Sequence, residues 1–108
     1  MIKKVPLTEW LVVVFDRPNV NRLLYRSQHL ARIPQLVESG VVTNVGPIFA
    51  DTDKTKFVGS SYNLRVNSRQ EAVDFLKQDI FYKEGIWDVE NAIIYPYTVV
   101  SRAAQAMK

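Results

Sequence analysis

Hydrophobic positions along the chain change their spacing from one segment to the next, alternating between strand-like and helix-like patterns. Residues 9–15 form a nearly continuous β-branched and aromatic run, which predicts a central strand with both faces covered. The run ends at residues 16–19, because Pro18 cannot donate a ladder hydrogen bond.

Residues 19–39 carry apolar side chains at helical spacing, and Gly40 stands where a left-handed cap is expected. Pro34 lies inside this pattern and predicts either a kink, with hydrogen-bonded turns resuming up to Ser39, or two shorter helices. His29 falls on the polar flank beside the apolar stripe. The stripe expected to be buried comprises Val20, Leu23, Leu24, Ser27, Leu30, Ala31, Pro34 and Val37.

The second half of the chain predicts two further strands, a helix and a last strand. Ser68 and Glu71 form a capping box at the start of this helix, since each side chain can satisfy a free backbone amide there. The expected segments are a strand over 41–49, a polar loop over 50–56, a strand over 57–66, a helix from 69 to about 78–79, an aromatic-rich connection over 80–88 and a strand over 89–95 stopped by Pro96. The tail over 101–108 is left open between a short helix and a frayed end.

The resulting order is β-α-β-β-α-β, which predicts a ferredoxin-like α+β fold with an antiparallel sheet and both helices on one face. We expect a single domain over residues 1–108, with a core over about 9–100. The strands are apolar on both faces, whereas two helices cover only one. A second copy of the chain would cover the other face, so the sequence predicts a face-to-face homodimer.

Composition narrows the possible functions. The 108 residues are 47% hydrophobic and 23% charged, which is typical of a folded globular domain. The net charge of +3 is scattered among acidic residues rather than clustered, so we expect no nucleic-acid partner. No apolar run approaches the ~20 residues of a membrane span, and residues 1–6 do not resemble a leader peptide. We therefore expect no membrane partner and a cytoplasmic location.

Most chemical motifs are missing or stand in the wrong context. Asp51-Thr52-Asp53-Lys54-Thr55 matches the letters D-x-D-x-T of a phosphotransferase motif, but it lacks the surrounding parallel-sheet pattern and is interpreted as a polar loop. One histidine, no cysteine and dispersed carboxylates do not suggest a metal site. Because there is also no glycine-rich phosphate loop, we expect no cofactor.

His29, the only histidine, is the natural candidate for acid–base chemistry near neutral pH. A helical histidine is more often an ordinary flank residue, but the expected topology favours a site. The start of the first helix and the ends of the second strand and second helix meet at one end of the sheet. His29 and Asp79 should lie there, with Asp51 or Asp53 nearby. Phe81, Tyr82 and Trp87 are expected to wall this region.

Several segments together resemble the YCII-related family over about residues 9–100, and most closely its fungal branch. They are Arg26-Ser27-Gln28-His29-Leu30, Glu38-Ser39-Gly40, Gly46-Pro47, Gly59-Ser60, residues 77–82, Gly85-Ile86-Trp87-Asp88 and Ile94-Tyr95-Pro96-Tyr97. The resemblance implies a dimeric α+β barrel with a histidine on the first helix and an aspartate after the second, which fall on His29 and Asp79. One family member is a dehydrochlorinase of a chlorinated aromatic compound. Ile80 departs from the family, which usually has proline after this aspartate.

We therefore expect a small enzyme that uses His29 as general acid or base on a cyclic or aromatic compound, by elimination or isomerisation. Asp79 would orient His29 at roughly 2.6–3.2 Å, and Arg26 would hold an anionic group of the substrate. The alternative is a non-catalytic dimeric module that binds a small molecule or a protein. A free ring nitrogen in an open pocket favours the enzyme, whereas a histidine with both nitrogens satisfied favours the module.

Overall fold

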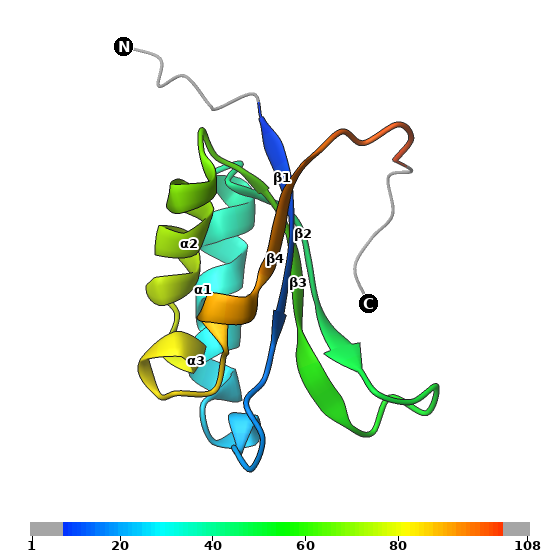
Figure 1. Ribbon diagram of the computed structural model, residues 1–108, viewed down its shortest axis with the longest axis vertical. Coiled ribbons are helices and arrows are strands. Elements are labelled where there is room, and N and C mark those ends of the chain that lie inside the picture. The colour runs from blue at the N-terminus through cyan, green and yellow to red at the C-terminus, as the bar shows by residue number, and fades with distance from the viewer. Residues whose placement is uncertain (1–7, 103–108) are drawn as a thin grey trace.

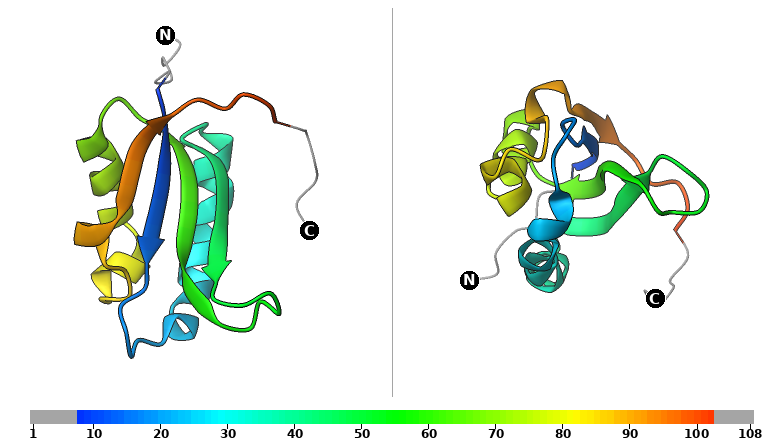
Figure 2. Two further views of the ribbon diagram at one scale, coloured as in Figure 1. Left: turned by 45° about the vertical axis from the view of Figure 1, so that its right-hand side comes forward. Right: turned by 90° about the horizontal axis from the view of Figure 1, so that it is seen from below.

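Four antiparallel strands form one sheet with the helices stacked against a single face (Figure 1). The computed structural model describes residues 8–102. The strand order is β2-β3-β1-β4, and two turned views show that the opposite face of the sheet carries no helix (Figure 2). The elements are β1 (Glu9–Phe15), η1 (Arg22–Leu24), α1 (Arg26–Glu38), β2 (Val42–Phe49), β3 (Phe57–Arg65), α2 (Arg69–Lys77), α3 (Ile80–Lys83), η2 (Val89–Asn91) and β4 (Ile93–Tyr97). The predicted ferredoxin-like α+β class is confirmed.

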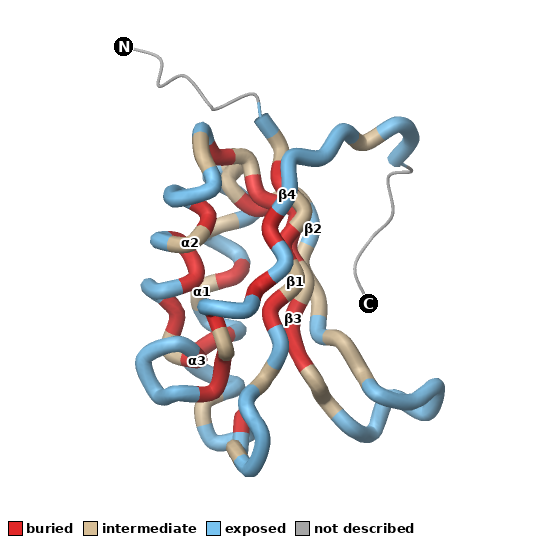
Figure 3. Tube along the Cα trace, in the orientation of Figure 1, coloured by how far each residue is buried: buried red, intermediate tan, exposed pale blue. Residues whose placement is uncertain are grey.

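The core lies between the helices and the sheet, where the buried residues concentrate (Figure 3). Alternate residues of β1 face it, because successive side chains of a strand point to opposite faces. Trp10, Val12 and Val14 are buried there and pair in register with Leu64, Tyr62 and Ser60 of β3. The other face of β1 carries the less buried apolar side chains of Leu11, Val13 and Phe15, and no helix covers it (Figure 2).

The start of α2 follows the predicted capping box. The Glu71 backbone N–H donates to Ser68 Oγ at 3.1 Å, and the Glu71 carboxylate accepts from the Asn67 backbone N–H at 2.7 Å. The first contact satisfies a free amide of the helix start, and the second satisfies the amide of the residue before the cap.

Helix α1 begins later than predicted and turns a different face inward. It starts at Arg26, after the separate 3₁₀ turn η1, and its buried residues are His29 and Ile33. The predicted buried stripe is wrong, since four of its members are more than two-fifths exposed: Leu23, Leu24, Leu30 and Val37. Buried polar contacts of Arg22 and His29 with distant segments fix the rotation of this part of the chain, and its apolar stripe therefore faces outward.

Pro34 lies inside α1 without ending it. The backbone N–H of Ser39 donates to the carbonyl of Gln35 at 3.0 Å, so helical turns resume after the proline as expected. Gly40 then takes a φ of 85°, the left-handed conformation predicted for a residue beyond the helix end.

The last strand differs from the prediction. The segment predicted to begin it forms η2, and β4 starts four residues later and includes Pro96. Proline is tolerated because β4 lies at the edge of the sheet, where an outward-facing position needs no ladder donor.

The expected connection over 80–88 also contains the short helix α3. Of the tail over 101–108, residues 103–108 lie outside the described residues. Across 8–102, no helix is long and apolar enough to cross a membrane.

Tyr62 offers a test of the core. Its side chain is fully buried, its hydroxyl has no hydrogen-bond partner among residues 8–102, and burial raises the pKa of this phenol above its usual 10.0. Because the desolvated hydroxyl costs free energy, we expect Tyr62→Phe to raise the free energy of unfolding by about 1 kcal/mol at neutral pH. Urea unfolding measures this directly, and a less stable variant would contradict it.

The same substitution has a pH signature. Above pH 10 the unfolded chain releases the Tyr62 proton while the folded chain retains it, so the native protein loses stability as pH rises. The loss approaches ~1.4 kcal/mol per pH unit and is absent from Tyr62→Phe. The stability difference between the two proteins should therefore widen between neutral pH and about pH 11.

Candidate functional site

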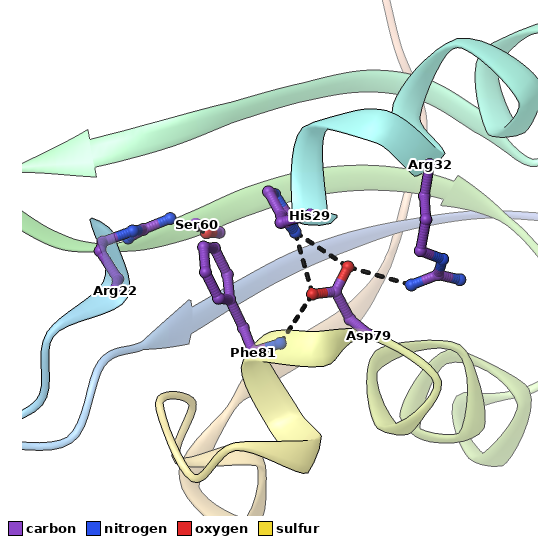
Figure 4. A network of polar contacts seen from close by, with 6 residues as sticks. All are labelled: Arg22, His29, Arg32, Ser60, Asp79 and Phe81. Carbon is purple, nitrogen blue, oxygen red and sulfur yellow. Dashed lines mark hydrogen bonds and ion pairs between the residues drawn. The ribbon is translucent and has the colours of Figure 1, made fainter. Parts of the chain in front are cut away.

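His29 and Asp79 lie in direct contact at the end of the sheet where α1 begins (Figure 4). His29 Nδ1 lies 2.8 Å from Asp79 Oδ2 and 3.0 Å from Oδ1. The histidine comes from the first turn of α1, and the aspartate from the link between α2 and α3. Their side chains are only 7% and 2% exposed. The distance between His29 Nδ1 and Asp79 Oδ2 therefore lies within the range expected for a direct hydrogen bond.

Three partners hold the Asp79 carboxylate. Besides His29, it accepts a hydrogen bond from Arg32 Nη1 at 3.0 Å and one from the Phe81 backbone N–H at 2.9 Å. The last contact makes Asp79 the N-cap of α3, with Ile80 in the first helical position. The structural role considered for Asp79, capping the next turn, is therefore present together with the contact to His29.

Aromatic side chains fix the plane of the imidazole. Phe81 stacks on the His29 ring with centroids 4.3 Å apart and planes 17° apart, and Trp87 meets the ring edge-on at 5.6 Å. Nδ1 faces the carboxylate, whereas Nε2 has no hydrogen-bond partner among the described residues. With the Nδ1 proton donated to Asp79, the neutral ring carries its lone pair at Nε2.

His29 also lines a cavity of about 260 Å³ between α1 and strands β2 and β3. Its polar lining comes from Arg22, Arg26, His29 and Ser60. The remaining lining is mainly apolar: Leu30, Ile33, Val45, Gly46, Pro47 and Phe57. This combination of apolar walls and few polar groups suits a small organic molecule.

The sequence analysis missed Arg22, which is only 7% exposed. Its Nη1 donates to Asp16 Oδ2 at 3.0 Å and to the Gly59 carbonyl at 2.9 Å, and its Nη2 donates to Ser60 Oγ at 3.0 Å. Burial raises the pKa of Asp16, although the neighbouring Arg22 opposes this shift. The one available signal was spacing, since Arg22 precedes His29 by seven residues, about two helical turns.

The other sequence-predicted site residues are dispersed. Arg26 lines the cavity, whereas Phe81 and Trp87 support the His29 ring rather than form the cavity lining. Tyr82 lies elsewhere, with its ring 5.8 Å from Lys77 Nζ on the surface of α2 and α3.

The loop carboxylates also stay away from the cavity. Asp51 accepts hydrogen bonds from the Thr55 backbone at 3.2 Å and the Thr55 hydroxyl at 2.9 Å, and these contacts lower the pKa of Asp51. Asp53 is exposed in the same loop, and neither aspartate contributes to the cavity lining. Among residues 8–102, no three histidine or carboxylate side chains are grouped as metal ligands would be.

Comparison with known proteins yields one family and several relatives. The YCII-related domain matches residues 8–96. The aspercryptin biosynthesis cluster protein B of Emericella nidulans is 34% identical over 87% of this chain. The match spans 65% of that protein's length. The fusaric acid biosynthesis protein 2 of Gibberella fujikuroi is 28% identical in a match that covers 84% of this chain and 93% of that protein.

A solved structure shares the fold. It is the 5-chloro-2-hydroxyhydroquinone dehydrochlorinase of Burkholderia phenoliruptrix, in complex with 2,5-dihydroxybenzoquinone. The match has a TM-score of 0.69 at 24% sequence identity and covers 83% of this chain and 93% of that chain.

Proposed function

The chain belongs to the YCII-related family, and from this premise we propose that it is a small enzyme acting on a cyclic or aromatic organic compound. His29 acts as the general base or acid, Asp79 orients it, and the reaction is an elimination or an isomerisation. One observation carries the proposal: a buried carboxylate holds Nδ1 of His29, while the ring lines a cavity and Nε2 has no partner within residues 8–102.

The chemistry follows from the two ring nitrogens. Nε2 removes a proton from an acidic C–H or O–H of the substrate, and the imidazolium formed is stabilised by Asp79. In an elimination, the electron pair left on the substrate forms a double bond and expels a leaving group such as chloride. The Nε2 proton then passes to water. In an isomerisation, the same proton returns to a different carbon.

The surroundings of His29 support a small aromatic substrate. The cavity is apolar on most of its lining, and Arg26 at its edge is exposed and available for an anionic group. Two relatives are named for the biosynthesis of aspercryptin and of fusaric acid, and the structural neighbour is a dehydrochlorinase in complex with 2,5-dihydroxybenzoquinone. These names make halogenated or hydroxylated single rings the first compounds to test.

A ligand test with 2,5-dihydroxybenzoquinone distinguishes the enzyme from the binding module. We expect the compound to raise the Tm of the native protein and to have little effect on His29→Ala, because a ligand stabilises only the form that it binds. Asp53→Ala is the matched control and should behave as the native protein. With 5-chloro-2-hydroxyhydroquinone, the native protein should release chloride and His29→Ala should not. Equal Tm shifts in both proteins without chloride release would favour the module.

The exposed sheet face supports a homodimer, which we propose as the working form. Its less buried apolar side chains lie on adjacent strands: Leu11, Val13, Phe15, Ile93 and Tyr95. Burying such a face against a second copy removes apolar surface from water at about 25 cal/mol per Å².

Sedimentation at micromolar concentration should therefore show a two-chain species. Ile93→Asp should dissociate it, because an unpaired carboxylate in the interface is costly. Leu23→Asp is the matched control, since Leu23 is also exposed but lies on the helical side of the domain. A native monomer, or dissociation by Leu23→Asp alone, would contradict the sheet-to-sheet arrangement.

A further inference from the structure

We propose that Arg22 and Ser60 form an anion-binding site at the inner wall of the His29 cavity, and that the cavity selects a singly charged, one-ring ligand. The ligand class is a planar carboxylate, enolate or phenolate. This inference rests on the proposed function for its location, because the anion site faces the same cavity as His29. The inference adds to the proposed function the pair of side chains, Arg22 and Ser60, that recognises the charge of the ligand.

Hydrogen-bond accounting identifies the free donors. Both N–H groups of Arg22 Nη1 are used, by Asp16 and by the Gly59 carbonyl. Nη2 carries two N–H groups, and the structure gives it one acceptor, Ser60 Oγ. Ser60 is 1% exposed, and its oxygen accepts from Arg22 while its own hydroxyl hydrogen has no acceptor among the described residues. One N–H and one O–H donor therefore remain available on adjacent side chains.

The guanidinium is held rigidly for this role. It pairs with Asp16 in a contact where both side chains are less than a tenth exposed, and it lies over the rings of Phe57 at 5.0 Å and Phe81 at 4.7 Å. Arg22 Nε is buried and has no partner in the part of the chain that the structure describes. A buried N–H group without an acceptor costs free energy, which favours a role for this arginine beyond its pairing with Asp16.

The size of the ligand follows from Phe81, which contacts both ends of the proposed site. Its ring stacks on His29 at 4.3 Å and lies under the Arg22 guanidinium at 4.7 Å (Figure 4). These two distances, 4.3 Å and 4.7 Å, place the His29 ring centroid and Arg22 Cζ at most about 9 Å apart. A single planar ring can place an anionic oxygen at Arg22 and a reacting atom at His29, in a cavity of about 260 Å³.

The charge of the ligand follows from the charged groups around the cavity. Three arginines and two aspartates belong to the network: Arg22, Arg26, Arg32, Asp16 and Asp79. One positive charge remains in excess while His29 is neutral. A monoanion balances this charge, whereas a neutral ring leaves the excess positive charge unbalanced.

Benzoate and its neutral isostere benzamide test the proposal without any turnover. Each is titrated into the native protein and followed by NMR of the His29 ring and the Ser60 amide. We expect benzoate to bind at least about tenfold more tightly than benzamide, because a charge-assisted hydrogen bond adds to affinity. Arg22→Gln should abolish the preference, and Ser60→Ala should reduce it. Arg69→Gln, which changes an exposed arginine of α2 outside the cavity lining, should retain it.

The variants keep the test independent of folding. The double variant Asp16→Asn/Arg22→Gln removes the buried ion pair together and leaves no unpaired charge, so it replaces Arg22→Gln if that variant unfolds. Equal affinities for the two compounds, no binding of benzoate at tens of millimolar, or a preference that survives loss of Arg22 would each overturn the proposal. Failure of the enzyme proposal looks different: anion preference persists, but no compound is converted.

Discussion

Asp79→Asn is expected to leave the domain folded and to lower turnover by about 10²- to 10⁴-fold, the range associated with loss of a correctly held general base. The amide oxygen can still accept from the Phe81 N–H and cap α3. The amide N–H₂ then faces His29 Nδ1, which must become an acceptor. The ring proton moves to Nε2, and the lone pair needed by a base is lost from the cavity side.

Two measurements check this expectation. Chloride release from 5-chloro-2-hydroxyhydroquinone reports turnover, and ¹⁵N NMR of the imidazole reports the tautomer. The chain has one histidine, so its ring signals are unambiguous. Asp53→Asn is the matched control, because it removes one exposed carboxylate from the β2–β3 loop. An unchanged tautomer with full turnover in Asp79→Asn would exclude Asp79 as the orienting residue.

The fold could be predicted from the sequence because its signals are local. The alternation in β3, the apolar run of β1 and the Ser68 capping box each depend on residues close together in the chain. The order of these elements limits the topology to very few arrangements. The contact between His29 and Asp79 could be expected from that topology, although fifty residues separate them.

The rotation of α1 could not be predicted in the same way. Helical spacing identifies an apolar stripe, but it does not identify the inward face when buried polar contacts decide the matter. Here the inward positions belong to Arg22 and His29, whose partners Ser60 and Asp79 lie on distant segments. The apolar stripe therefore faces outward, and the sequence analysis assigned no role to Arg22.

The position of β4 was misjudged for a related reason. Pro96 is a stop signal in a central strand but not in an edge strand, and the sequence does not state where a strand lies in the sheet. Tyr82 was expected, together with Phe81 and Trp87, to wall the region around His29. A short helix sends successive side chains in different directions, and α3 turns Tyr82 outward while Phe81 stays buried.

Asp79 also links the site to the stability of the domain, and Asp79→Ala should expose this link. The substitution removes the acceptor of His29, Arg32 and the Phe81 N–H at once, in a side chain only 2% exposed. We expect the free energy of unfolding to fall by about 3–5 kcal/mol, the cost of breaking a buried pair by removing one partner. Domains of this size are stable by about 5–15 kcal/mol, so the loss is a large part of the total.

Urea unfolding of a small series isolates the cause. Asp74→Ala is the matched control on α2, since Asp74 is exposed and its side chain accepts only from Gln70 among the described residues. It should cost less than about 0.5 kcal/mol. Asp79→Asn, which keeps the cap of α3, should lie between the two. A double-mutant cycle with His29→Ala then gives the coupling energy of the pair. A loss below about 1 kcal/mol in Asp79→Ala, or zero coupling to His29, would mean that the carboxylate acts chiefly on the ligand and not on the fold.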